Sequence, residues 1–432
     1  MLAMQNWKIK LSLFLNYFVF AILLNSSGIV ILQVQNNFNI QPKDAAWIDP
    51  CKDISIAVVS FLIASYITRI GYKKAMLLAL GFITTICFIM TFAASFFAAK
   101  LLFVATGASF ALIKMSVYST LGIVTKDSKE HISLMNFLES FFMVGTLAGY
   151  FIFSYYVKQN SDPHSTYWFH VYYLLGAISL LAFLLLLSAK LDESSIKTTE
   201  SKPLLDEFGD MFKLMVSPIV LIFIISAFFY VLIEQSIQNF LPTFNNKVLL
   251  ISSALSIQMT SILAGSTAVG RFLAGILLRK LNWFVVLTAC LVLAAAIILF
   301  SMPIIKDFIA NYKGSGINEL KDVPLIAFVF PLIGLVLAPI YPAINSIILS
   351  SLPKPKHGLM SGLIIIFSAL GGTCGSLIMG RLFEGKGGQT AMYFALIPIA
   401  ILMTSLYFFK KQQKKEAGAN ISLPLPMQDV IV

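Results

Sequence analysis

The sequence predicts an all-α membrane protein with twelve transmembrane helices in two pseudo-symmetric six-helix bundles. Three observations support this prediction: the composition, the number of apolar runs, and an internal repeat, in which the second half of the chain resembles the first. Of the 432 residues, 58% are hydrophobic and only 12% are charged, and the mean hydropathy is +0.86. Soluble domains carry about 25% charged residues, so we expect this chain to lie in a bilayer.

Each of twelve apolar runs is long enough to cross a membrane. A spanning helix needs about 20 mostly apolar residues, because the hydrocarbon core is about 30 Å thick. The first run contains Asn16, Tyr17 and Asn25 and no small-residue cleavage site follows it, which favours a retained span over a signal peptide. The predicted spans are 10–32, 45–67, 75–97, 101–124, 132–156, 166–188, 214–240, 250–278, 283–304, 323–350, 358–381 and 390–409.

Positive charge is distributed unevenly among the connections between these spans. With both termini inside, the cytoplasmic side carries about twice as many lysines and arginines as the outer side. This is the positive-inside pattern, so we expect both termini to be cytoplasmic, in a bacterial inner membrane. The same distribution accounts for the net charge of +11 and leaves no basic stripe for nucleic acid.

The longest polar segment, residues 190–213, divides the chain into two halves. It predicts a bundle at 1–189, a cytoplasmic linker, a second bundle at 214–410 and a cytoplasmic tail at 411–432. The halves echo each other, because ASYITRIGYKKA (64–75) after the second span corresponds to GILLRKLNWFVV (275–286) after the eighth. Duplicated halves around a central cavity are typical of secondary transporters.

The loop after the second span resembles the signature Gly-x-x-x-Asp-Arg-x-Gly-Arg-Lys of the major facilitator superfamily. The resemblance extends over nearly the whole chain and implies that superfamily's fold, with a gate at this loop. Thr68 stands where the superfamily has an acidic residue, so the gate is expected to depend on other partners. The signature falls on Ala64, Thr68, Arg69, Gly71, Tyr72 and Lys73, and the second half adds Arg271, Gly275, Arg279 and Lys280 to the expected gating residues.

Three further stretches are similar to helices of the fucose/proton symporter family. They are EQSIQNFLPTF (234–244), VGRFLAG (269–275) and YPAINSIILSSLPKPKHGLMSG (341–362). This similarity implies proton-coupled uptake of a sugar. The membrane carboxylates of that family correspond to Gly28 and Lys114 in this chain, so coupling is expected to use other residues.

Lys114, Glu139 and Glu234 are the ionisable residues expected deepest in the membrane. A charge at that depth costs about 2.5–3.5 kcal/mol on insertion scales, so it faces a cavity or a partner. Lys114 and Glu139 fall at similar depths on neighbouring helices, where they form a switchable pair, a static pair, or no pair at all. Tyr118 shares a helix face with Lys114 and supplies a hydroxyl group.

Amide side chains gather around Glu234 in the seventh span. Gln235, Gln238 and Asn239 follow it just before Pro242, which favours a bend. Amides donate and accept hydrogen bonds, so this patch suits a hydroxyl-bearing ligand; the alternative is a helix end that meets water.

Two other spans carry polar residues where a carrier places its binding site. Asn25 interrupts the first span, either as a ligand contact or as a helix-packing hydrogen bond. Tyr341 and Asn345 share a face of the tenth span. Asp49, Lys52 and Asp53 begin the second span near the outer surface and are expected to have a structural or gating role.

Enzyme motifs are missing from the sequence: it contains no GxGxxG, P-loop or HExxH pattern, and its four cysteines have no metal-ligand spacing. We therefore expect no enzyme activity, no metal and no cofactor, with a proton gradient, or a sodium gradient, as the energy source. The partners expected are a small-molecule substrate and membrane lipids, with no obligate protein partner. The predicted function is uptake of a sugar or an organic anion. The alternatives are an exporter of metabolites or drugs, a carboxylate siderophore carrier, and a receptor that does not transport.

Overall fold

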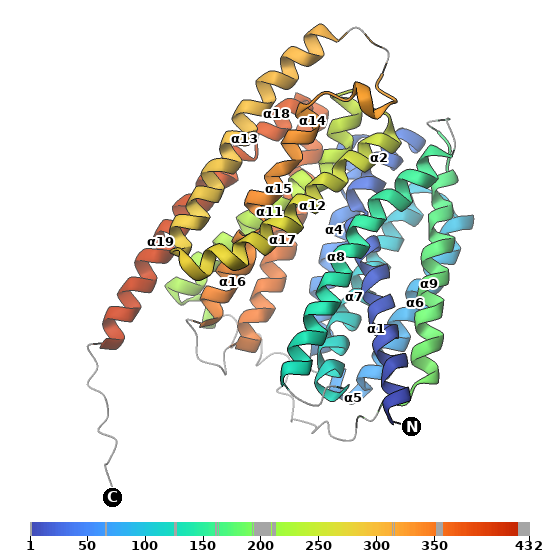
Figure 1. Cartoon of the computed structure of the whole chain (residues 1–432), viewed down its shortest axis with the longest axis vertical. Helices are drawn as coiled ribbons and strands as arrows, with labels where there is room; N and C mark the ends of the chain where they lie inside the picture. Colours follow the sequence, from blue (N-terminus) through green and yellow to red (C-terminus); the bar gives the residue numbers. More distant parts are fainter. Residues whose placement is uncertain are drawn as a thin grey trace, which may run out of the picture.

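The fold is all-helical in a computed structural model of the chain (Figure 1). Within the described part of the chain, β-structure is limited to an isolated bridge between Ile251 and Ile317. The structure describes residues 2–64, 67–124, 128–159, 164–191, 213–312, 316–350 and 357–421, with the single positions 162, 193, 209 and 314.

Helices before the predicted linker pack together as a first bundle. α4 packs on α7, α6 on α7 and α9, and α1 on α8 and α9. The elements are α1 (Leu2–Asn25), α2 (Ser27–Phe38), α3 (Pro42–Ala45), α4 (Ile48–Ala64), α5 (Ile67–Ile70), α6 (Tyr72–Phe92), α7 (Phe96–Val124), α8 (Ser128–Lys158), the 3-10 helix η1 (Tyr167–His170) and α9 (Val171–Ser188).

Helices after the linker pack as a second bundle around α11, which contacts α17, α19, α12 and α16. The elements are α11 (Pro218–Lys247), α12 (Ser253–Lys280), α13 (Trp283–Asn311), η2 (Leu320–Asp322), α14 (Ile326–Val329), η3 (Phe330–Leu332), α15 (Ile333–Leu337), α16 (Ile340–Ser350), α17 (His357–Lys386), α18 (Gly388–Tyr393) and α19 (Leu396–Ile421).

The predicted all-α membrane fold is confirmed by the lengths and hydropathy of these helices. Eleven helical stretches of the described chain are long and apolar enough to cross a membrane. The predicted second span corresponds to α4, a helix of 17 residues. With α4, each bundle holds the six helices that the apolar runs predict.

The first, the tenth and the twelfth predicted spans are not single helices, and the twelfth is divided into α18 and α19 at residues 394–395. The first breaks at Ser26, whose hydroxyl group donates to the Leu23 carbonyl at 2.8 Å, and α2 then continues to Phe38, six residues beyond the predicted end. The tenth is divided into α14, η3, α15 and α16, and Pro331 and Pro339 fall at its interruptions. Proline lacks the backbone donor that a continuous helix requires.

The two bundles meet toward the end of the molecule opposite the termini. α1 begins and α19 ends at the same end, and toward that end the ribbons of the two bundles diverge (Figure 1). At the opposite end, Lys43 pairs with Glu384 at 2.9 Å. Nearby, the Gln35 amide donates to Thr243 at 3.2 Å. We call this the closed end.

Gly28 shows how tightly the bundles approach. A Cβ atom at this position would lie 2.8 Å from the Gln238 carbonyl oxygen and 2.9 Å from that of Asn239. Real Cβ atoms do not approach backbone oxygens so closely, so the contact between α2 and α11 requires glycine here.

Candidate functional site

A cavity of about 110 Å³, the central cavity, lies between the two bundles. α1 and α8 of the first bundle line it, together with α11, α12 and α15 of the second. Its polar lining side chains are Asn25, Thr146, Tyr150, Glu234, Gln238, Thr267 and Arg271.

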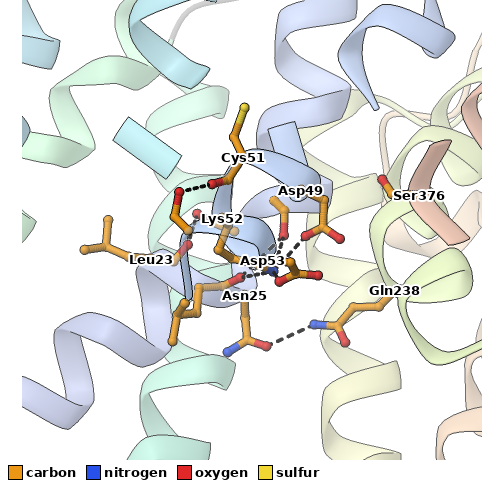
Figure 2. Close-up of polar contacts among 12 residues, drawn as sticks. Leu23, Asn25, Asp49, Cys51, Lys52, Asp53, Gln238 and Ser376 are labelled. Carbon is orange, nitrogen blue, oxygen red and sulfur yellow. Dashed lines mark hydrogen bonds and ion pairs between the residues drawn. The ribbon is translucent and has the colours of Figure 1, made fainter. Parts of the chain in front are cut away.

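An amide pair joins the bundles at this cavity. The Gln238 amide of α11 donates to Asn25 Oδ1 at 3.0 Å (Figure 2). Asn25 in turn donates to Thr146 Oγ1 of α8 at 3.1 Å and to the Ala21 carbonyl at 2.8 Å. Because Asn25 is the last residue of α1 before the break at Ser26, the orientation of its amide depends on how that break is held.

An ionisable pair lies on the second-bundle side of the same cavity. Arg271 NH2 of α12 lies 3.9 Å from Glu234 Oε1, and their side chains are 45% and 24% exposed. The buried Tyr230 hydroxyl donates to the same carboxylate oxygen at 2.9 Å. Tyr230 also stacks on Tyr341 with ring centroids 5.5 Å apart, so four residues of three helices form one contact chain.

A second group of charges is buried beside the cavity, the triad Asp49, Lys52 and Asp53 of α4. Lys52 Nζ lies 2.7 Å from Asp49 Oδ1 and 3.5 Å from Asp53 Oδ1. The lysine side chain is 5% exposed, and those of the aspartates are 0% and 12% exposed. Buried charges of this kind are stable only when they are paired and hydrogen-bonded.

The triad contacts both the break in the first span and the second bundle. Lys52 Nζ donates to the Leu24 carbonyl at 3.3 Å and lies 3.4 Å from Ser27 Oγ, on the two sides of Ser26. Figure 2 shows Lys52 between the two aspartates, with the Asn25–Gln238 pair next to them. A Cβ atom on Gly372 of α17 would lie 2.4 Å from Asp53 Oδ2, so α17 packs directly on the triad.

The other candidate binding residues that the structure describes do not line the central cavity. Gln235 lies beside Gly372, whose Cβ would be 3.3 Å from its Cγ. Asn239 is 1% exposed, and neither polar atom of its amide has a hydrogen-bond partner among the described residues. Tyr341 hydrogen-bonds Ser368 at 2.8 Å. Asn345, on the same helix α16, is half-buried.

Two of the three charged candidates, Lys114 and Glu234, have side chains that the structure describes. Lys114 is exposed and its Nζ lies 5.8 Å from the centroid of the Phe110 ring. The side chain of Glu139, its proposed partner, lies outside the described residues, so the pairing stays a prediction. The same applies to the side chain of Tyr118, and to the gating candidates Arg69, Gly275 and Arg279.

The loop after α4 has a definite geometry at Gly71 and Lys73. Gly71 has φ +86°, and a Cβ atom there would lie 2.6 Å from Glu193 Oε2. The Lys73 backbone amide donates to Glu193 Oε1 at 2.6 Å, and its Nζ donates to the Leu187 carbonyl at 3.2 Å near the end of α9. These contacts lie within the first bundle. Lys280, which corresponds to Arg69 in the matching segment of the second half, is exposed.

Sequence reasoning missed the depth of the triad and the contributions of Thr146 and Tyr150 to the cavity. Its signal for the triad was the spacing, since Asp49, Lys52 and Asp53 at i, i+3 and i+4 share one helix face. Within the described residues, no three His, Cys, Asp or Glu side chains gather where they could hold a metal ion.

Two helical bundles with a polar cavity between them define a multi-pass membrane transporter. The sequence model of the Major Facilitator Superfamily matches residues 12–312, more than half of the chain. The protein therefore belongs to the major facilitator superfamily. No curated protein sequence matches it.

Solved structures share this fold at low sequence identity. A bacterial homolog of the human lysosomal transporter Spinster, in an inward-facing and unoccupied conformation, is 15% identical over 95% of this chain and 98% of its own, with a TM-score of 0.74. A D-xylose–proton symporter is 12% identical over 94% and 97%, with a TM-score of 0.70. The E. coli fucose:proton symporter is 16% identical over 93% and 98%, with a TM-score of 0.59. These neighbours do not single out fucose.

Proposed function

We propose that the protein takes up a small polar solute, a sugar or an organic anion, together with protons, by alternating access of the central cavity. The observation that carries the proposal is the lining of that cavity. It brings an ionisable pair, Glu234 and Arg271, next to the amide pair Asn25 and Gln238. Amides suit hydroxyl groups because they donate and accept, and a membrane carboxylate is suited to proton transfer.

Glu234 is the proposed coupling residue among those described. Arg271 lies 3.9 Å from its carboxylate, and the Tyr230 hydroxyl donates to the same oxygen. A proton bound from the outer side removes this attraction and releases Arg271, so the pair changes with each turn of the cycle. Release of the proton inside restores the pair. Glu139 remains the second candidate from the sequence.

Rocking of residues 1–189 against 214–432 would expose the central cavity to each side in turn. With cytoplasmic termini in a bacterial inner membrane, the closed end faces outward. The ion pair between Lys43 and Glu384 and the hydrogen bond between Gln35 and Thr243 must then break for a solute to enter. The ion pair is partly exposed and the hydrogen bond is buried; an exposed ion pair contributes little free energy, which suits a gate that opens repeatedly.

Arg271 separates the two proposed solute classes. Its guanidinium group is 45% exposed beside the cavity and can bind a carboxylate in a forked geometry. An Arg271→Gln variant is expected to lose transport of an organic anion while it retains transport of a neutral sugar. Equal losses for both classes would show that the arginine serves the cycle and not solute selection.

Uptake into proteoliposomes with an imposed pH gradient tests the function. One proton per solute and a gradient of one pH unit sustain about tenfold accumulation, because one unit corresponds to 1.36 kcal/mol. Sugars and organic acids are screened one by one, and the gradient is collapsed with a protonophore as a blank. We expect accumulation of one solute class by the parent protein, and a ratio of about 1 for Glu234→Gln with solute exchange retained.

The matched control is Glu319→Gln, since Glu319 is an exposed carboxylate paired with Lys321 outside the cavity. This variant should accumulate solute as the parent does. If Glu234→Gln also accumulates solute, the assignment of the coupling residue is wrong, and Glu139→Gln, measured in parallel, identifies the other candidate. Saturable binding with no accumulation of any solute would instead indicate a receptor, and accumulation only in inverted vesicles would indicate an exporter.

A further inference from the structure

A second polar cavity lies at the closed end, and the proposed transport cycle does not use it. Its volume is about 560 Å³, within the range of about 300–1,000 Å³ for small-molecule sites. α2, α8 and η1 of the first bundle line it, and so do α11 and α12 of the second. We call it the outer cavity. Because both bundles form its walls, any ligand in it contacts both.

Gln33 gives the outer cavity an unused hydrogen-bond donor. This side chain of α2 lines the cavity and is 3% exposed. Its Nε2 atom has no hydrogen-bond partner among the described residues. A buried amide donor without an acceptor is unfavourable, so the position is suited to an acceptor oxygen of a ligand.

Lys247 and Asn36 provide a fixed positive edge across the two bundles. Lys247 Nζ of α11 donates to Asn36 Oδ1 of α2 at 2.6 Å, and Asn36 donates to Ser253 Oγ of α12 at 3.0 Å. Lys158 also lines the cavity, and Asp162 is the acidic residue among the lining side chains. Two ammonium groups against one carboxylate favour an anionic ligand.

Trp168 lies in the wall of the outer cavity, where it is almost completely buried and held in place. It lines the cavity, it is 2% exposed, and its indole nitrogen donates to Asn37 Oδ1. Its ring is 4.0 Å from that of Phe169 and 6.4 Å from that of Phe153, centroid to centroid. The exposed ring of Tyr167 also lines the cavity. An aromatic ring beside amides and ammonium groups matches a ligand with an apolar ring face, several hydroxyl groups and a carboxylate.

We propose that the outer cavity is a second binding site, for a sugar acid or a similar polyhydroxylated carboxylate. A ligand bound there holds the two bundles together at the closed end, because it touches α2 and α8 on one side and α11 and α12 on the other. A ligand that binds one conformation shifts the equilibrium toward it. Occupancy therefore slows opening of this end, and this consequence rests on the proposed transport function, whereas the binding itself does not.

The emission of Trp168 reports binding directly. The chain has four tryptophans, and replacing Trp7, Trp47 and Trp283 with phenylalanine leaves Trp168 as the single emitter. The purified protein in detergent is titrated with D-glucuronate and, separately, with D-glucose as the uncharged counterpart. We expect a saturable change with glucuronate and at least about tenfold weaker binding of glucose, because glucose lacks the carboxylate that Lys247 faces.

Two variants and one control locate the site. Gln33→Leu and Lys247→Gln, each in the single-tryptophan background, are expected to weaken glucuronate binding about tenfold. Lys306→Gln removes an exposed lysine of α13 outside this cavity and should leave binding unchanged. Size-exclusion chromatography identifies a variant that has not folded. If one of the two variants has not folded, the glucuronate affinity of the other tests the site.

Three outcomes would overturn the proposal: no saturable change with glucuronate, equal binding of glucose, or unchanged binding in both folded variants. The titration needs no membrane gradient. A protein that binds glucuronate at Trp168 but transports nothing would support the outer site while it refuted the proposed function. Inhibition of solute uptake by external glucuronate, lost in Lys247→Gln, is the expected result when both hold.

Discussion

Replacement of Lys52 by methionine tests whether this lysine stabilises the two buried carboxylates of the triad. The lysine lies 2.7 Å from Asp49 and 3.5 Å from Asp53. At an effective dielectric constant of about 20, unit charges at these separations attract by about 6 and about 5 kcal/mol, which offsets desolvation of several kcal/mol per ion. Removing one partner of a buried pair costs about 3–5 kcal/mol. We expect Lys52→Met to reduce the free energy of unfolding by that amount.

Unfolding in mixed micelles of increasing SDS fraction, followed by the reactivity of the buried Cys87 thiol, measures this free energy. A double-mutant cycle with Asp49→Asn separates the pair from the individual side chains. The double variant Asp49→Asn/Lys52→Met should be at least about 1 kcal/mol more stable than the additive expectation, because it leaves one carboxylate without its lysine, Asp53, instead of two. Lys306→Met, on the exposed face of α13, is the matched control and should unfold as the parent does.

Two observations would refute this reasoning. The first is a Lys52→Met protein whose unfolding free energy lies within about 1 kcal/mol of the parent, since that is below the cost of an unpaired buried charge. The second is an additive cycle, with a coupling energy under about 0.5 kcal/mol. Either result would mean that water or other groups already balance the aspartates.

Two further predictions concern contacts between the bundles. Gly372→Ala places a Cβ atom 2.4 Å from Asp53 Oδ2 and is expected to destabilise the protein by about 1–3 kcal/mol in the same unfolding assay; Gly265→Ala, whose Cβ meets its nearest atom at 4.0 Å, should not destabilise it. The hydrogen bond and charge of Glu384 raise the pKa of Lys43 above its usual 10.5. A raised lysine pKa stabilises the closed end at neutral pH and loses this effect as the pH rises through that pKa. Lys43→Gln should therefore lengthen spin-label distances across the closed end at pH 7 and have no effect at strongly alkaline pH, and an equal effect at both pH values would contradict the ion-pair explanation.

The helices could be predicted because a bilayer imposes a minimum length of apolar sequence on every span. The polar residues Asn25, Ser26 and Ser27 mark an interruption of the first span in the sequence, but the contacts that hold the break could not be predicted. Lys52 donates to the Leu24 carbonyl from a residue 28 positions away. A carbonyl satisfied by a distant lysine does not need its helical partner, and this compensation is invisible in the local pattern.

The burial of the triad does not follow from its position along the second span. Asp49 lies four residues inside the predicted second span, which suggests an exposed helix end. In the structure α7, α17 and α2 pack on α4, and Asp49 is 0% exposed. Position along a helix gives a height in the membrane, whereas burial depends on which neighbouring helices cover that height.

Lys52 and Lys114 show what this difference means for function. Both are lysines in apolar runs, but Lys114 is exposed beside Phe110, while Lys52 is buried against two carboxylates. Lys52 also holds the two sides of the break that orients Asn25, and Asn25 accepts the amide of Gln238 from the other bundle. We therefore expect a change of charge in the triad to alter a hydrogen bond between the bundles through two short contacts. In the proposed alternating access the two bundles move relative to each other, so charge and movement would be linked at this break, while the pairing of Lys114 with Glu139 stays a prediction.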